Sequence, residues 1–209
     1  MKAKLEVVSG FLGSGKTSFI NAYLNTEVCF EKEILIILLE KGIGSIRSDL
    51  KNVKVIYLED IEKLKDQLLK ELIEKEYSKV IIEFNGTSSL NIIGEILCDK
   101  LVRKKINFYG SYYIGDSKNI KIYLKNLGEI IIPFIQSSKL IILNNLSLLK
   151  IKEQKELIKS IEDINLTAPI ILSQSLSTLD TEMKLSKYFR EDTSIKKLKS
   201  LIYKKEVVK

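Results

Sequence analysis

The chain has 209 residues, of which 45% are hydrophobic and 29% are charged. This length predicts one compact domain with a sizeable core and is too short for two large domains. The apolar runs, such as residues 34–39 and 130–135, are shorter than a membrane span, and residues 1–8 do not resemble a secretory signal. We therefore expect a cytoplasmic protein without a transmembrane span.

The net charge of +7 comes almost entirely from lysines that are spread along the chain among many acidic residues. Such a pattern is typical of a solvated surface, so we expect no nucleic-acid partner. The chain has two cysteines, Cys29 and Cys98, and no histidine. Neither a disulfide framework nor a clustered site for a soft metal is therefore predicted.

Apolar segments that suit buried strands alternate along the chain with segments of helical periodicity. The predicted strands are residues 4–8, 33–39, 53–58, 79–83, 107–114, 140–143 and 169–173. The predicted helices are residues 16–24, 61–76, 88–104, 120–127 and 151–164. Strands that are apolar on both faces and alternate with helices predict an α/β fold, with a mostly parallel sheet between two layers of helices.

We predict that one domain covers residues 1–190 and that a basic helix or tail follows over 191–209. The tail places its apolar residues on one helical face and its lysines on the other. A helix of this kind docks on its own domain, or binds a membrane or a partner.

Polar residues follow several of the predicted strands. They are Ser9, Glu40, Glu83, Asn144 and Ser173. Ligands bind at the carboxyl ends of the strands in open parallel sheets, so we expect these five strand ends to meet at one crevice.

Residues 10–17 read GFLGSGKT and match the phosphate-binding pattern G-x-x-x-x-G-K-[S/T] between a predicted strand and a predicted helix. The glycines allow backbone N–H groups to turn inward as an anion-binding nest, and the helix N-terminus adds partial positive charge. Lys16 then neutralises the terminal phosphates, and the hydroxyl of Thr17 is a ligand for Mg²⁺. The residues predicted to bind the nucleotide are Gly13, Ser14, Gly15, Lys16, Thr17, Ser18, Asn144 and Ser173.

The stretch 7–17, including Phe11 and Leu12 in the loop, resembles the opening of the CobW-type P-loop GTPases, relatives of the metallochaperone GTPases HypB and UreG. Residues 81–86 are similar to the strand of this family that ends in E-x-x-G. Further similarities are Glu40 followed by Gly42 after the second strand, and residues 133–148, which lead into the guanine-recognition motif with Asn144 at its first position.

The resemblance covers about residues 3–175. It implies a P-loop GTPase that uses Mg²⁺, assists the assembly of a metal centre in a client protein, and forms a homodimer.

Two glutamates are candidate metal ligands beside Thr17. Glu83 at a strand end suits Mg²⁺, which prefers carboxylate oxygens; it also suits a cap for the helix predicted to start near Ser88. Glu40 is either a second metal-site residue or the partner of Lys41 in a surface ion pair. Asp116 resembles an acidic residue of the family and also suits a cap for a helix that begins near Lys118.

The sequence departs from the family in three places. The guanine-recognition motif N-K-x-D is replaced by Asn144-Asn145-Leu146-Ser147, so the carboxylate that binds the guanine edge is missing and the nucleotide is GTP or ATP. The C-x-C-C motif between the second and third strands is absent, and Cys29 and Cys98 suit buried small residues. We also expect the family's second domain and its histidine-rich segment to be absent.

We predict a P-loop protein that hydrolyses GTP or ATP slowly, with Lys16 and Glu83 as catalytic residues and Thr17, Glu83 and Glu40 around Mg²⁺. Its partners would be the nucleotide, a client protein and a second copy of the chain. The first alternative is a regulatory or scaffold subunit that binds nucleotide without hydrolysis. The second is a small-molecule kinase, which usually needs an arginine-bearing lid, whereas the three arginines, Arg47, Arg103 and Arg190, are scattered.

Overall fold

The computed structural model describes residues 2–29, 32–40, 44–47, 50–86 and 90–189. The predicted basic tail over 191–209 lies outside the described residues. The strands are β1 (Ala3–Gly10), β2 (Ile34–Leu38), β3 (Val53–Tyr57), β4 (Lys79–Asn85), β5 (Ile106–Asp116), β6 (Leu140–Asn144) and β7 (Ile170–Leu172). The helices are α1 (Lys16–Leu24), α2 (Leu64–Glu74), α3 (Asn91–Cys98), α4 (Lys100–Lys105), α5 (Ile120–Ser137), α6 (Ile151–Ile164) and α7 (Leu179–Leu185).

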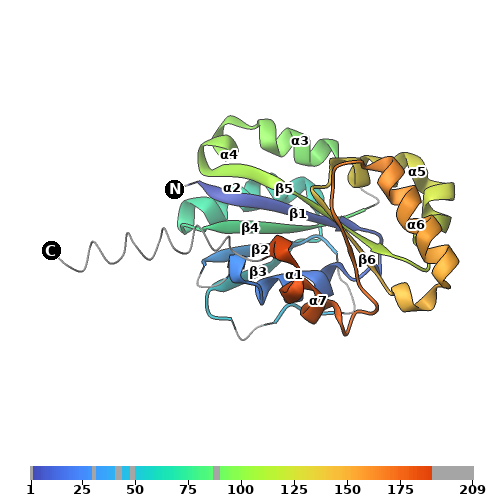
Figure 1. Cartoon of the computed structure of the whole chain (residues 1–209). Helices are drawn as coiled ribbons and strands as arrows, with labels where there is room; N and C mark the ends of the chain where they lie inside the picture. Colours follow the sequence, from blue (N-terminus) through green and yellow to red (C-terminus); the bar gives the residue numbers. More distant parts are fainter. Residues whose placement is uncertain (1, 30–31, 41–43, 48–49, 87–89, 190–209) are drawn as a thin grey trace.

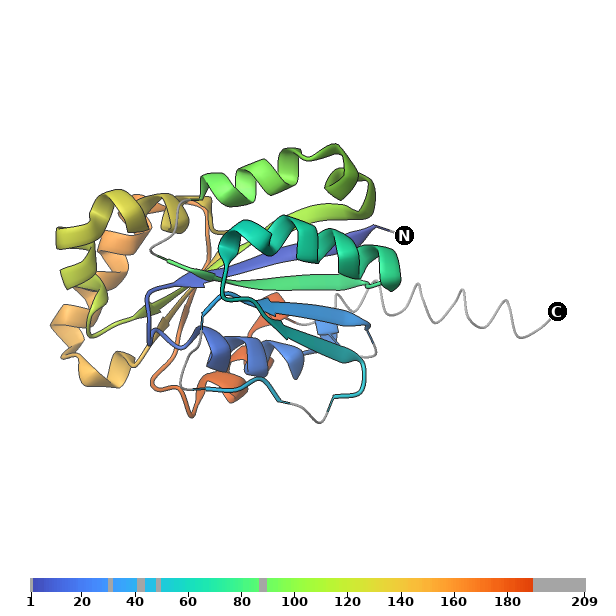
Figure 2. The ribbon, with the colours of Figure 1, turned by 180° about the vertical axis from the view of Figure 1, so that it is seen from behind.

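The strands form one sheet in the order β3-β2-β4-β1-β5-β6-β7, and every neighbouring pair is parallel. Helices cover both faces of the sheet (Figures 1 and 2). The predicted α/β fold is confirmed. Because β1 lies between β4 and β5 and all strands run the same way, the loop after β1 emerges near the middle of the carboxyl edge.

The two faces of the sheet bury two separate apolar clusters. On one face, side chains such as Val7, Ile82 and Leu143 pack against α2 to α6. On the other face, Val8 and Ile81 pack with α1 and α7. Alternate residues of each strand point to opposite faces, so strands covered on both sides must be apolar throughout.

Three helical segments differ from the sequence prediction. The single helix predicted over 88–104 is divided into α3 and α4 at Asp99, whose side chain accepts hydrogen bonds from the N–H groups of Leu101 and Val102. The helix predicted over 120–127 continues to Ser137 as α5, with a kink at Leu127 and with Pro133 inside it.

Pro133 removes one hydrogen bond from α5, but this half of the helix buries Ile131, Phe134 and Ile135, which holds it on the sheet. Helix α7 was not predicted. It is short, and only Leu179 and Met183 mark its buried face against α1.

A charged cluster lies beneath α1 at the amino end of the sheet, away from the phosphate loop. Glu6 is fully buried and lies 3.0 Å from the ammonium of Lys79, which is only 3% exposed. The hydroxyls of Tyr23 and Tyr112 donate to the same carboxylate at 2.9 and 3.0 Å. Burial, followed by the negative charge of Glu6, raises the pKa of both phenols, so they remain protonated donors.

We expect Lys79→Met to lower the free energy of unfolding by about 3 kcal/mol, because it leaves the buried charge of Glu6 without its closest cation. The measurement is urea denaturation followed by circular dichroism. Lys65→Met is the control, since Lys65 is half exposed and 3.9 Å from Asp99. The double variant Glu6→Gln/Lys79→Met should recover part of the loss; equal losses for Lys79→Met and Lys65→Met would contradict this account.

Candidate functional site

The loop between β1 and α1 has the backbone of an anion-binding nest. Gly13 and Gly15 have φ angles of 73° and 97°, a region that side chains disfavour, and Gly15 is the N-cap of α1. No atom lies within 4 Å of the place where a Cβ on Gly13 would be. The loop therefore leaves open space beside turned backbone N–H groups at a helix N-terminus, which suits a phosphate.

The ammonium of Lys16 lies inside this loop. Its side chain is 3% exposed, and Nζ donates to the carbonyl oxygens of Gly10 and Phe11, both at 3.1 Å. Nζ also lies 2.7 Å from Oε2 of Glu40. Glu40 therefore pairs with the lysine of the loop, whereas Lys41, the alternative partner, lies outside the described residues.

Glu83, at the end of β4, faces the first turn of α1. The hydroxyl of Thr17 lies 3.1 and 3.3 Å from its two carboxylate oxygens. Burial raises the pKa of Glu83 above the ordinary value, and the charge of Lys16 and the hydrogen bond from Thr17 act in the opposite direction. The predicted neighbours Lys16, Thr17, Glu40 and Glu83 thus form one connected group.

Three buried polar atoms near the loop have no hydrogen-bond partner among the described residues. They are Oγ of Ser14, Oγ of Ser117 and Oδ1 of Asn144. Asn144 nevertheless contacts the loop, because its Nδ2 donates to the carbonyl oxygen of Ser14. The main-chain carbonyl oxygen of Asn144 accepts from the N–H of Ser117. Buried polar groups are nearly always satisfied in folded proteins, so these atoms fit a polar ligand.

The segment after β6 uses its side chains within the protein. Asn145 adopts a left-handed backbone conformation and donates to Asp116 at 3.0 Å. Ser147 donates from Oγ to the carbonyl oxygen of Gln174 at 2.8 Å. Asp116 also accepts from the side chain of Asn119, so it ties the two loops together instead of capping α5 through its side chain.

The remaining predicted site residues are placed less directly. Ser173 is fully buried at the end of β7, and its hydroxyl donates to the carbonyl oxygen of Ser175. Ser9 was expected at the crevice but lies within β1, where its hydroxyl donates to the carbonyl oxygen of Tyr112. Ser18 is half-buried in the first turn of α1.

Residues 4–172 match the family model of the CobW/HypB/UreG nucleotide-binding domain. The chain belongs to this family. The match contains the phosphate loop, Glu40, Glu83 and Asn144, which are the residues that the structure brings together.

Solved structures share the fold. The Zn(II)-bound YjiA GTPase from E. coli is 20% identical with a TM-score of 0.63, over 81% of this chain and 57% of that chain. The hydrogenase maturation factor HypB from Archaeoglobus fulgidus is 17% identical with a TM-score of 0.55, over 84% of this chain and 83% of that chain. This CobW/HypB/UreG domain therefore spans little more than half of the YjiA chain. A comparison with curated proteins finds no match.

Two contacts of the site were not predicted from the sequence. The ring of Phe11 in the phosphate loop stacks on Tyr123 of α5, with centroids 4.2 Å apart. In the loop after β7, the N–H of Gln174 donates to Oε1 of Glu182, a residue of the unpredicted helix α7. The sequence signal for the stacking contact was an aromatic residue in a glycine-rich loop. The contact of Gln174 with Glu182 gave no signal, because α7 is too short to show a clear periodicity.

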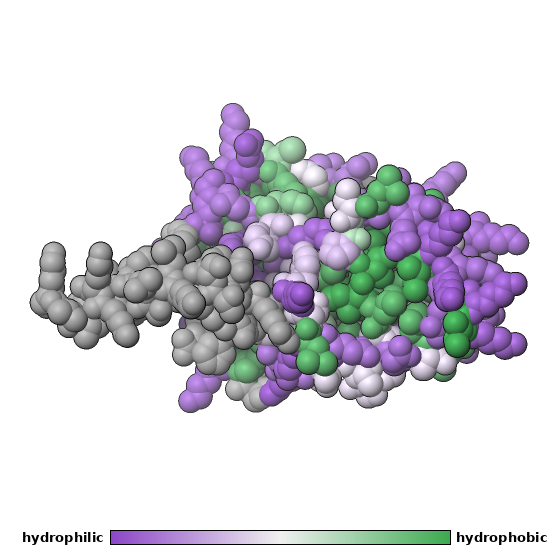
Figure 3. Space-filling view, viewed as in Figure 1, coloured by the Kyte–Doolittle hydropathy of each residue, from purple (hydrophilic) through white to green (hydrophobic). Residues whose placement is uncertain are grey.

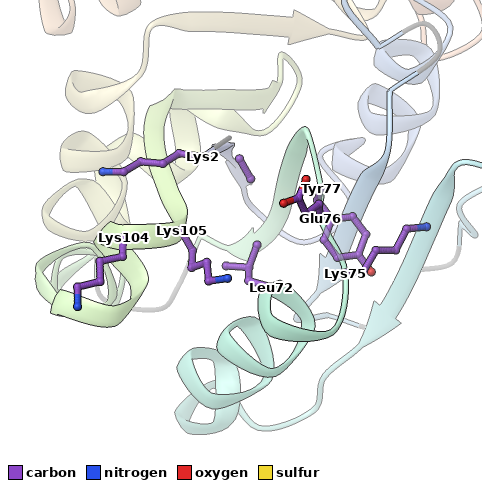
Figure 4. A pocket seen from close by; sticks show the side chains of 8 residues that line it. Lys2, Leu72, Lys75, Glu76, Tyr77, Lys104 and Lys105 are labelled. Atoms are coloured by element: carbon purple, nitrogen blue, oxygen red, sulfur yellow. The ribbon is translucent and has the colours of Figure 1, made fainter.

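A separate cavity of about 350 Å³ lies at the opposite end of the sheet (Figure 4). It is lined by Lys2, Lys75, Tyr77 and Lys105, among others, from the start of β1 and the ends of α2 and α4. Lys75 already pairs with Glu33 at 2.8 Å, and lysines near helix C-termini favour the helix dipole. The basic lining is therefore accounted for by local structure.

The cysteines of this CobW/HypB/UreG domain lie apart. Cys29 is buried and Cys98 is exposed, and both are free thiols. Burial raises the pKa of the Cys29 thiol to about 11. In the described part of the chain, no group of three or more His, Cys, Asp or Glu residues is placed to hold a metal ion. Among the same residues, no helix is long and apolar enough to cross a membrane.

We expect a thiol reagent such as DTNB at pH 8 to modify about one thiol per native chain rapidly, at Cys98. Cys29 should react only after unfolding, because it is buried and stays protonated. Absorbance at the released thionitrobenzoate band gives the count, and Cys98→Ser should remove the fast phase. Two fast thiols in the native protein would contradict this assignment.

Proposed function

We propose that the chain is a nucleoside triphosphatase of the CobW type that binds GTP with Mg²⁺ and assists the assembly of a metal centre in a client protein. The observation that carries this proposal is the buried ammonium of Lys16 inside a glycine-rich nest, 2.7 Å from Glu40. A buried cation paired with an acidic side chain is ready to exchange that partner for a phosphate. Membership of the family supports guanosine as the nucleoside.

In this proposal Lys16 and the backbone N–H groups of residues 13–17 hold the β- and γ-phosphates. Lys16 would leave Glu40 for the γ-phosphate and neutralise the charge that develops on it during transfer to water. Glu83 would orient the water, since its carboxylate is an acceptor at the end of β4 beside the loop.

The donor set beside the phosphates fits Mg²⁺. It consists of the hydroxyl of Thr17 and the carboxylates of Glu83 and Glu40, which are hard oxygen ligands, and Mg²⁺ usually keeps waters and phosphates as its other ligands. When bound, Mg²⁺ would supply positive charge to the phosphate oxygens. Loss of Glu40 from Lys16 would free that carboxylate for the cation or its water shell.

The metal-centre and partner parts of the proposal rest on the family and on the surface. YjiA is described as a Zn(II)-bound GTPase and HypB as a hydrogenase maturation factor, and both share this fold. On the face shown in Figure 3, an apolar area lies over β6. Elsewhere in the chain, Leu172 of β7 and Leu176 in the following loop are 38% and 40% exposed. Exposed apolar areas often mark protein interfaces, so this area suits a client protein or a second copy in a homodimer.

A regulatory subunit that binds nucleotide without hydrolysing it is the second candidate. It is favoured by the internal use of Asn145 and Ser147, the positions that read the base in the family. Multiple-turnover phosphate release that is abolished by Lys16→Ala would exclude it. The kinase alternative has little support, because Arg47 is tied to Asn25 of α1 and Arg103 lies in α4; Arg190 lies outside the described residues.

Lys16→Ala should weaken the binding of GTP with Mg²⁺ by about 100-fold, because it removes a charge-assisted contact and leaves Glu40 and Glu83 without their cation. Isothermal titration calorimetry measures the affinity. Lys104→Ala, in α4 at the opposite end of the sheet, is the matched control and should bind as the wild type does. Unchanged binding of both GTP and ATP by Lys16→Ala would refute the proposal.

Glu83→Gln should raise the Mg²⁺ concentration needed for half-maximal phosphate release by about 10-fold, since an amide is a weaker ligand for a hard cation. The same variant should melt no lower than the wild type without nucleotide. Burial raises the pKa of Glu83, so folding disfavours its ionised form at neutral pH, and the amide removes that charge. A lower melting temperature with an unchanged Mg²⁺ requirement would contradict both roles.

A further inference from the structure

We propose that Glu182 in α7 is the carboxylate that recognises the guanine base, in place of the aspartate that the family carries at the position of Ser147. This inference rests on the proposed function, because it concerns the base of the nucleotide whose phosphates the loop holds. It names a specificity-determining residue outside the four-residue motif.

Ser147 and Asn145 are both engaged in the protein. The N–H and the hydroxyl of Ser147 both donate to the carbonyl oxygen of Gln174, at 3.3 and 2.8 Å. The side chain of Asn145 donates to Asp116. Neither residue has a carboxylate, so this motif offers no acceptor pair to the N–H groups of a base.

Glu182 brings a carboxylate to the same loop. Its Oε1 accepts from the N–H of Gln174 at 3.2 Å. Its Oε2 is buried and has no hydrogen-bond partner in the structure. A buried carboxylate oxygen without a donor costs free energy, and a ligand that brings an N–H group would satisfy it.

The loop from Ser173 to Leu176 connects this carboxylate to the phosphate site. A Cβ on Gly15 would lie 2.5 Å from Leu176 and 2.6 Å from the side chain of Asn144, so the loop lies directly on the phosphate-binding turn. Asn144 also has an unpartnered acceptor, Oδ1. Two acceptors without donors among the described residues, Oδ1 of Asn144 and Oε2 of Glu182, therefore belong to side chains that contact the phosphate loop and the loop after β7, respectively.

Helix α7 is packed closely enough on α1 to hold the carboxylate of Glu182 in a fixed position. Leu179 and Met183 are fully buried against α1, and Asp180 accepts a hydrogen bond from Asn25 at the end of α1 at 2.7 Å. Because α1 begins at the phosphate loop, the carboxylate of Glu182 keeps a fixed place relative to the phosphates.

The chemistry of a carboxylate favours guanine over adenine. Guanine presents two neighbouring donors, N1–H and the 2-amino group, to which a carboxylate can bind together. Adenine presents a donor beside the lone pair of N1, which a carboxylate repels. Hypoxanthine keeps N1–H but lacks the 2-amino group, so inosine diphosphate isolates one of the two contacts.

The test is calorimetric titration of the whole chain with GDP, IDP and ADP in the presence of Mg²⁺, since diphosphates avoid hydrolysis. The wild type should bind GDP at least about 10-fold more tightly than IDP, and ADP more weakly than GDP. Glu182→Gln and Glu182→Ala should bring the GDP-to-IDP ratio below about 3. Glu162→Gln, which makes the same change at an exposed position of α6, should keep the wild-type ratio.

A merely structural role of Glu182 in holding Gln174 would lower the melting temperature and leave the GDP-to-IDP ratio unchanged, and that result overturns the inference. Equal binding of GDP and IDP by the wild type, or tighter binding of ADP, overturns it as well. If Glu182→Gln does not fold, the GDP-to-IDP ratios of Glu182→Ala and of the wild type decide between the two roles. Absence of binding of any diphosphate by the wild type would instead refute the proposed function.

Discussion

The buried ammonium of Lys16 is the constraint around which this site is arranged. A charge that is 3% exposed requires partners, and the protein supplies two carbonyl oxygens and the carboxylate of Glu40. The carbonyls belong to the loop itself and stay in place, whereas Glu40 follows β2 and comes from a different segment. A phosphate can therefore replace Glu40 without dismantling the loop. The backbone turns at Gly13 and Gly15 act together with Lys16, because they direct N–H groups toward the anion that Lys16 attracts.

The parallel sheet separates the chemistry from the stabilising charges. At the carboxyl edge, Lys16 pairs with Glu40 and Thr17 donates to Glu83. Toward the amino ends of β1 and β4, Glu6 and Lys79 form a buried pair that two tyrosine hydroxyls complete. In the first group, a bound phosphate would exchange with Glu40 as the partner of Lys16. In the second group, every charge has its partners within the protein, and these contacts hold α1 on the sheet. One strand pair thus carries both, because Glu6 lies opposite Ile81, two residues before Glu83 on β4.

The sequence predicted the sheet well, and residues 10–17 have the turned backbone expected of a phosphate loop, because both depend on local patterns. Strands buried on two faces are apolar runs, and residues 10–17 form a contiguous motif, so neither needs knowledge of distant contacts. The end of α5 was missed because a proline usually stops a helix, whereas here three buried side chains outweigh the lost hydrogen bond. Helix α7 was missed because a segment of seven residues is too short to show helical periodicity. The pairing of Lys16 with Glu40 was not predicted either, since it joins two loops that only the sheet brings together.

Base recognition is the part of the site that sequence motifs describe least securely, and the reason is physical. Phosphates bind mainly to backbone N–H groups, which require a particular backbone and therefore particular glycines. A base binds to side chains, and any loop that reaches the same place can supply the needed acceptor. In this chain Ser147 and Glu182 both contact the backbone of Gln174 in the loop after β7, so a carboxylate missing at one residue has a counterpart at the other. An altered N-K-x-D motif is therefore weak evidence against guanine binding when a neighbouring helix places an unpartnered carboxylate oxygen at the same loop.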